Sequence, residues 1–122
     1  MANVFDWFND PKRASEPAWD VIVLDPPPFA KSKSALDGAL RGYKEINLRA
    51  MKLLNPGGYL VTCSCSYNVN EEMFAEAILE ASIDSRVPMT IAEKRMQGRD
   101  HPVLVGVPET YYLKCFILRR VE

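Results

Sequence analysis

The sequence lacks the features that mark membrane proteins, secreted proteins and highly charged nucleic-acid-binding proteins. No apolar run approaches the roughly 18 residues of a membrane span. The amino terminus has no basic segment followed by an apolar core, so we expect no secretory signal. Lys and Arg total 15 against 16 Asp and Glu, which excludes a protein whose affinity for nucleic acid comes from bulk charge. The 122 residues suffice for one domain.

Cysteine is scarce as well. Cys63, Cys65 and Cys115 form an odd set without the spacing of a disulfide framework, so we expect reduced thiols and a cytoplasmic protein. Cys63 and Cys115 are typical of small core residues, whereas Cys65 ends an expected strand, where an exposed thiol can act as a nucleophile. His101 is the one further soft ligand, so we predict no metal site. This histidine is either a polar surface residue or a functional residue of its long loop.

Four segments in the first two thirds of the chain carry the periodicity of strands and helices. Residues 21–24 form an uninterrupted apolar run, typical of a parallel strand buried on both faces, and the prolines after Asp25 end it. Apolar residues follow helical spacing from 36 to 54, and the Asn-Pro-Gly-Gly at 55–58 is expected to stop that helix and turn the chain. Residues 59–65 predict the next strand, and Asn70 is a candidate N-cap for a second helix.

The order of these elements predicts an α/β fold. Strands linked by helices indicate a mostly parallel sheet, and two further strands are expected at 89–94 and 112–119. No helix separates these last two, so they should form an antiparallel hairpin. Ligands of open α/β sheets bind beyond the carboxyl ends of the strands, where the loops 25–31 and 64–70 should lie.

The loop after the first strand combines a carboxylate, prolines, an aromatic ring and a cation. Asp25 either caps the loop or serves as a carboxylate whose position Pro26 and Pro27 fix for hydrogen bonding to a flat substrate. Phe29 offers a stacking surface for a base or packs within the loop. Lys31 either contacts a phosphate or is simply solvated.

Charge is distributed unevenly along the chain. Residues 29–52 hold six basic and two acidic side chains, a surplus of four positive charges. Residues 53–90 hold five acidic side chains and one Arg, a surplus of four negative charges. Either these are two solvated helix faces of opposite sign, or the first stretch meets a phosphate backbone.

Taken together, these motifs resemble a known family. Asp25-Pro26-Pro27-Pro28-Phe29 and Ser64-Cys65-Ser66 are similar to the catalytic loop and the nucleophile loop of class I S-adenosylmethionine-dependent RNA methyltransferases. The nearest branch is the RlmI-like enzymes that make 5-methylcytosine in large-subunit ribosomal RNA. Further matching segments are residues 42–47, Pro56-Gly57-Gly58, Asp100-His101-Pro102 and residues 108–114.

The resemblance implies a covalent mechanism on ribosomal RNA. Cys65 would add to C6 of cytosine, so that C5 becomes electron-rich enough to accept a methyl group. Asp25 would hydrogen-bond the cytosine at N3 and at its amino group. The other implied substrate contacts are Pro26, Pro27, Phe29 and Lys31.

The resemblance also implies S-adenosylmethionine as cofactor, with Asn3, Asp25 and Pro26 beside it. Nothing in the sequence resembles the family's glycine-rich cofactor loop, its acidic residue after the second strand or its N-terminal RNA-binding domain. We therefore expect residues 1–122 to be the C-terminal half of a Rossmann-like catalytic domain. Alone, this half should bind the cofactor weakly or not at all and be inactive.

Two other functions remain open. An N-methyltransferase acting on an amino group also uses a Pro-Pro-aromatic loop, but it needs no thiol, so Cys65 separates the two reactions. A folded fragment without catalytic activity is the other alternative. In either case the strand at 21–24 carries neither charge nor proline within it, so we expect self-association through this exposed sheet edge.

Overall fold

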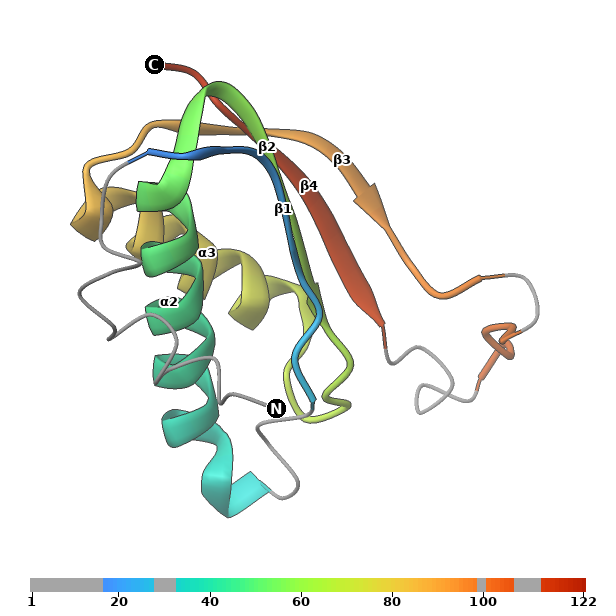
Figure 1. Cartoon of the computed structure of the whole chain (residues 1–122). Helices are drawn as coiled ribbons and strands as arrows, with labels where there is room; N and C mark the ends of the chain where they lie inside the picture. The colour runs from blue at the N-terminus through green and yellow to red at the C-terminus, as the bar shows by residue number, and fades with distance from the viewer. Residues whose placement is uncertain (1–16, 28–32, 99–100, 107–112) are drawn as a thin grey trace.

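The computed structural model describes residues 17–27, 33–98, 101–106 and 113–122. A sheet with two helices packed on one of its faces makes up this part of the chain (Figure 1). The elements are β1 (Trp19–Leu24), η2 (Lys33–Ala35), α2 (Leu36–Leu53), β2 (Leu54–Ser64), α3 (Glu71–Ser85), β3 (Met89–Arg95) and β4 (Lys114–Arg120). Neither helix of this part is both long and apolar enough to cross a membrane.

The four strands lie in the order β1-β2-β4-β3. β1 pairs with β2 in parallel, and β4 runs antiparallel to both β2 and β3. It follows that β1, β2 and β3 point the same way and that β4 alone is reversed. The predicted α/β class, the mostly parallel strand direction and the final antiparallel hairpin are confirmed.

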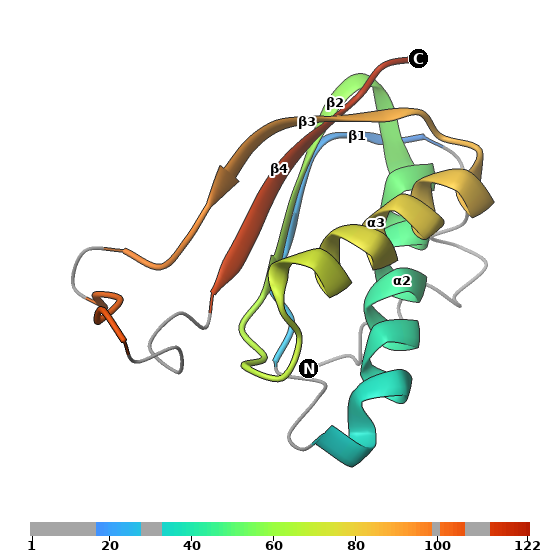
Figure 2. The same cartoon turned by 180° about the vertical axis from the view of Figure 1, so that it is seen from behind.

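One face of the sheet forms the core. Leu60 of β2 and both Phe116 and Leu118 of β4 point toward the helices and are almost completely buried. Phe74 of α3 lies against Phe116, with ring centroids 5.2 Å apart, and against Tyr43 of α2, at 5.6 Å. Figure 2 shows α3 crossing α2 on this side of the sheet.

The other face is uncovered at β1, which corrects one expectation. The apolar run of β1 was expected to be buried on both faces, yet Val21 and Val23 are 58% and 64% exposed. Ile22 and Leu24 alternate with them and point toward the helices, where Leu24 is buried. The described residues thus provide a layer on only one side of the sheet.

The predicted turn at 55–58 lies inside β2, which begins directly after α2. Trp19 pairs with Leu54 and Val21 pairs with Tyr59, so four residues of β2 bulge out opposite a single residue of β1. Gly57 has a φ of 82°, and a Cβ on Gly58 would come within 2.8 Å of a carbonyl oxygen. The two glycines allow the chain to turn and still remain paired with β1.

The helix α3 has the predicted cap. The Asn70 side chain accepts a hydrogen bond from the Met73 amide at 2.8 Å. Glu71 and Glu72 occupy the first turn, where their charge favours the helix dipole. The helix ends at Arg86, which adopts a left-handed conformation with a φ of 59°.

Candidate functional site

The carboxyl ends of β1 and β2 meet at one edge of the sheet. Leu24, the last residue of β1, pairs with Thr62 near the end of β2. The loop that starts at Asp25 and the loop that starts at Cys65 are therefore neighbours, as predicted from the sequence. The amino-terminal end of α2 lies at this same end of the molecule (Figure 1).

A sulfur contact joins the two loops. The Cys65 thiol points to the main-chain carbonyl of Pro26 at 4.0 Å. Cys65 is half-buried, so it is held against the Asp25 loop and still has access to solvent. Asp25 and Pro27 are exposed, and Pro26 is half-buried. A carboxylate and a thiol are thus available together at the edge where α/β sheets bind ligands.

Two buried side chains fix the residue that follows Cys65. The Lys114 ammonium donates a hydrogen bond to the Ser66 carbonyl at 2.7 Å. The Ser66 hydroxyl shares a hydrogen bond with the Tyr43 hydroxyl at 2.9 Å. Asn47, one turn further along α2, donates to the Tyr43 carbonyl at 2.7 Å. The Cys65 loop is therefore anchored both to β4 and to α2.

Sequence reasoning missed Lys114, because a lysine is ordinarily a surface residue. It begins β4 and is only 2% exposed. The signal that could have found it is alternation, since Lys114, Phe116 and Leu118 share one face of the strand. Burial lowers the pKa of Lys114, and the negative charge of the Cys65 thiolate opposes that decrease.

The other two cysteines face each other across β2 and β4. Cys63 pairs with Cys115 in the register of the two strands. Burial, together with the hydrogen bond from Cys63 to Cys115, raises the pKa of Cys63 to about 12. Cys63 is buried, as expected, and it stays protonated at neutral pH, which makes it a poor nucleophile. Cys115 was expected to be a core residue as well, but it is only half-buried.

Several predicted site residues cannot be placed. Asn3, Phe29 and Lys31 lie outside the described residues, so their roles remain predictions. His101 is exposed, and its amide donates to the Gly98 carbonyl at 3.0 Å. Within the described ranges, no three His, Cys, Asp or Glu side chains are grouped so that they could hold a metal ion.

Ion pairs account for part of the basic stretch. Lys44 lies 2.6 Å from Asp84 of α3, whose hydrogen bond is the main cause of the raised pKa of Lys44. Arg49 lies 2.6 Å from Glu45, one turn earlier in α2. The Lys44 pair joins the two stretches, and this favours the interpretation that they are two helix faces of opposite sign.

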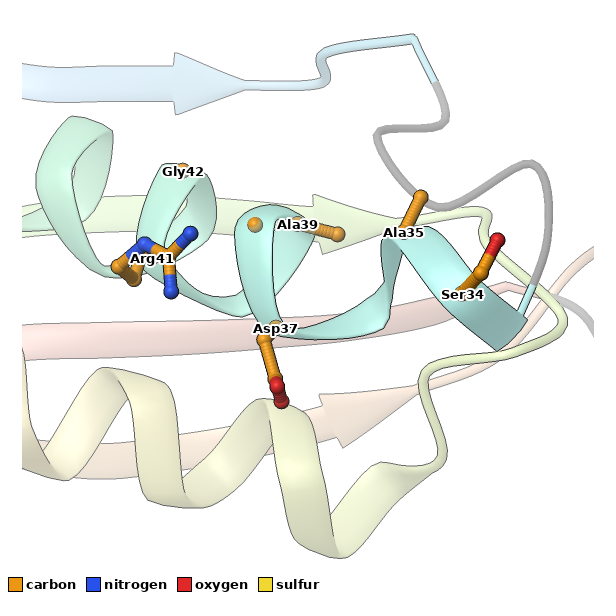
Figure 3. A pocket seen from close by; sticks show the side chains of 7 residues that line it. Ser34, Ala35, Asp37, Ala39, Arg41 and Gly42 are labelled. Atoms are coloured by element: carbon orange, nitrogen blue, oxygen red, sulfur yellow. The ribbon is translucent and has the colours of Figure 1, made fainter.

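Two cavities flank the start of α2. One of about 570 Å³ is lined by Ser34, Ala35, Asp37, Gly38, Ala39, Arg41 and Gly42. Figure 3 shows its acidic side chain, Asp37, projecting away from Ala35. The other, of about 280 Å³, lies between α2 and α3 and is also lined by Arg41. Neither lining includes a residue of the Asp25 loop or the Cys65 loop.

Three curated proteins similar to this chain share the name ribosomal RNA large subunit methyltransferase I. The protein from Shewanella frigidimarina is 50% identical over 101 residues, which are 83% of this chain and 25% of that protein. The one from Vibrio cholerae is 48% identical over 98 residues, 80% of this chain and 25% of that protein. The one from Tolumonas auensis is 47% identical over 103 residues, 84% and 26% respectively. The chain is thus homologous to these proteins and spans about a quarter of their length.

Solved structures agree on the fold. A candidate methyltransferase complexed with SAH superposes with a TM-score of 0.77 over 98% of this chain and 30% of that chain, at 22% identity. A candidate SAM-dependent methyltransferase from Streptococcus mutans gives the same TM-score, coverage and identity. At this identity the likeness concerns the fold alone. No model of a protein family matches the sequence.

Proposed function

We propose that the chain is the C-terminal part of the catalytic domain of a cytoplasmic S-adenosylmethionine-dependent methyltransferase. Its substrate would be C5 of cytosine in ribosomal RNA. The observation that carries this proposal is the contact between Cys65 and Pro26, which brings a half-buried thiol beside the exposed Asp25. The name shared by relatives at 47–50% identity supports it. Activity would belong to the whole protein, of which this chain spans about a quarter.

The thiol is the group that this reaction requires. C5 of cytosine is an unactivated ring carbon, and addition of a Cys65 thiolate to C6 would give C5 the electron density to form a bond to a methyl group. Loss of the C5 proton would then expel the thiolate and restore the ring. Covalent catalysis of this kind replaces one difficult step by several easier ones. Cys63 is a poor alternative, because its pKa of about 12 keeps it protonated.

Asp25 would bind the cytosine and stabilise charge on its ring. Its carboxyl group follows β1 directly and is exposed, so a base brought to this edge could donate from its amino group to one carboxyl oxygen. A proton shared between the other oxygen and N3 would offset the negative charge that develops on the ring when C6 is attacked. Pro26 and Pro27 restrict the loop, which keeps Asp25 in place. Phe29 and Lys31 would complete the substrate contacts. A base inside a helix must be unstacked before it can enter such a site.

The cofactor would supply the methyl group from its sulfonium. Of the three residues expected beside it, Asp25 and Pro26 are described, and they fit a ligand lying across the strand ends, because Asp25 is exposed and Pro26 borders Cys65. Asn3 would be the third. These residues would orient the methyl-bearing end of the cofactor toward the cytosine that Cys65 holds.

The test uses the full-length protein that contains this chain. Radiolabelled S-adenosylmethionine and unmodified ribosomal RNA are supplied to the wild type and to Cys65→Ala and Cys63→Ala. We expect Cys65→Ala to abolish methyl transfer and Cys63→Ala to retain most of it. RNA carrying 5-fluorocytidine, which cannot lose a proton from C5, should form a denaturation-resistant adduct with the wild type and none with Cys65→Ala.

Other outcomes would identify the alternatives. Methyl groups found on an amino nitrogen, with Cys65→Ala still active, would indicate an N-methyltransferase. A dead Cys63→Ala beside an active Cys65→Ala would exchange the roles of the two thiols. A full-length protein that transfers no methyl group to any RNA would favour a folded segment without catalytic function.

A further inference from the structure

Lys114 is an unusual core residue. It lies at the amino-terminal end of β4, opposite Ser64 at the carboxyl end of β2, and on the helix-facing side with Phe116. Lysines are almost never this deeply buried without a partner, because removing an ammonium from water is costly. An apolar side chain of similar length would fill the same space but could not donate a hydrogen bond, so the groups that the ammonium contacts matter for its role.

The ammonium is directed at the Cys65 loop. It donates to the Ser66 carbonyl at 2.7 Å, and hydrogen bonds from a charged donor are roughly twice as strong as neutral ones. The Ser66 hydroxyl is held in turn by Tyr43, which is itself fully buried and packed edge-on against Phe74. Ser66 therefore has little freedom to move, and the preceding Cys65 is restricted with it.

The same ammonium lies near Cys65, because the carbonyl that it binds belongs to Ser66, the next residue in the chain. Negative charge on Cys65 raises the pKa of Lys114 against the lowering effect of burial, so the two groups are close enough to influence each other. A cation beside a cysteine favours the thiolate, which is the reactive form. Because Lys114 is buried, dissolved salt screens this interaction little.

We propose that Lys114 is a positioning residue for Cys65, holding its loop through the Ser66 carbonyl and stabilising negative charge on its sulfur with the ammonium. The proposal rests on the proposed function for the identity of the electrophile that Cys65 attacks. The reactivity of the thiol is a property of this chain and can be measured without RNA or methyl donor.

Alkylation by iodoacetamide measures that reactivity. The thiolate displaces iodide to form a sulfur–carbon bond and the thiol proton passes to solvent, and mass spectrometry reports the rate for each cysteine. In Lys114→Met we expect Cys65 to react about tenfold more slowly at pH 7 than in the wild type. Lys114→Arg, which keeps the charge, should restore part of the rate. Lys94→Met is the matched control, since Lys94 is a half-exposed lysine of β3 paired with Glu71 at 3.2 Å, and it should change nothing.

A second variant separates charge from structure. Tyr43→Phe removes the hydrogen bond to the Ser66 hydroxyl and leaves the lysine in place. If Lys114 acts through charge, Tyr43→Phe should slow Cys65 much less than Lys114→Met does. Equal slowing in both variants, or no rescue by arginine in a folded protein, would reduce Lys114 to a structural residue and overturn the electrostatic part of the proposal.

The wild type alone gives a further test that does not require any variant to fold. Cys65 and Cys115 are both half-buried, and Cys65 should react about tenfold faster because of the ammonium beside it. Equal rates would contradict the proposal. Because these measurements need no methyl transfer, their failure would leave the proposed reaction untouched, and an inactive full-length enzyme would leave the effect of Lys114 on Cys65 intact.

Discussion

The two faces of the sheet differ sharply in what covers them. On the helix side, Leu60, Phe116 and Leu118 are at most 1% exposed. On the other side, Val21 and Val23 are more than half exposed, and Arg119 lies over the Tyr59 ring, 5.9 Å from its centroid. Parallel strands such as β1 and β2 usually lie in sheets that are covered on both faces. The described residues therefore build one complete core, whereas β1 offers apolar surface on the second face to whatever lies next to it.

This difference predicts that core truncation on the helix side has the largest effect on stability. Phe74→Ala removes a fully buried ring that contacts both Tyr43 and Phe116, so the free energy of unfolding should fall by about 4 kcal/mol. The matched change on the open face, Val23→Ala, should alter it by less than about 0.5 kcal/mol. Urea denaturation of both variants measures this. Similar losses in the two would mean that the open face is covered in solution.

The bulge of β2 at residues 55–58 should be the place where a substitution has the next largest effect on stability. In Gly58→Ala, the new Cβ would lie 2.8 Å from the Asn55 carbonyl oxygen and 3.0 Å from that of Asp20, so the junction of β1 and β2 must shift. We expect a loss of about 2 kcal/mol. Gly38→Ala is the control, because this helical position is open and alanine favours a helix by about 1 kcal/mol. A stable Gly58→Ala variant would show that the bulge adapts easily.

The helices, the strands and the strand-end site could be foreseen because their signals are local. Helical periodicity, the Asn70 cap and the prolines after β1 each act within a few residues. The bulge could not be foreseen, because two adjacent glycines are equally typical of a turn that ends strand pairing. Only the register with Trp19 and Val21 shows that β2 remains paired with β1 on both sides of these glycines.

Features that depend on distant residues could not be predicted. An apolar run such as that of β1 does not show whether a second layer covers it. The environment of Lys114 depends on Ser66, 48 residues earlier in the chain. The alternation of β4 places this lysine in the core, but its partner follows only from the packing of β4 against the end of β2.

The open face also predicts self-association. Val21 and Val23 belong to β1, which is the last strand on its side of the sheet within the described residues, and unpaired apolar edges promote pairing with other chains. Val23→Lys should weaken association at least about tenfold, which corresponds to about 1.4 kcal/mol, and leave the fold intact. Light scattering over a concentration series measures this, with Thr90→Lys as the control at an exposed position of β3. A wild type that stays monomeric at high concentration would contradict the prediction.

Ionisation of Cys63 should have the smallest effect on the free energy of unfolding. It tests whether all residues of the open face are equally exposed to water. Unlike Val21 and Val23, it is buried, and its pKa is about 12 instead of the ordinary 9.0. Above pH 9 the unfolded chain releases this proton while the folded protein keeps it, so the unfolded state binds fewer protons and the free energy of unfolding falls as pH rises. Between pH 8 and pH 10 the loss should be about 1 kcal/mol. Other groups titrate in this range, so the informative quantity is the difference between the wild type and Cys63→Ala in urea denaturation at the two pH values. The variant should be less stable at pH 8 but lose less stability by pH 10. Parallel losses would mean that Cys63 ionises as readily in the folded protein as in the unfolded chain, and that this part of the open face is as accessible to water as Val23.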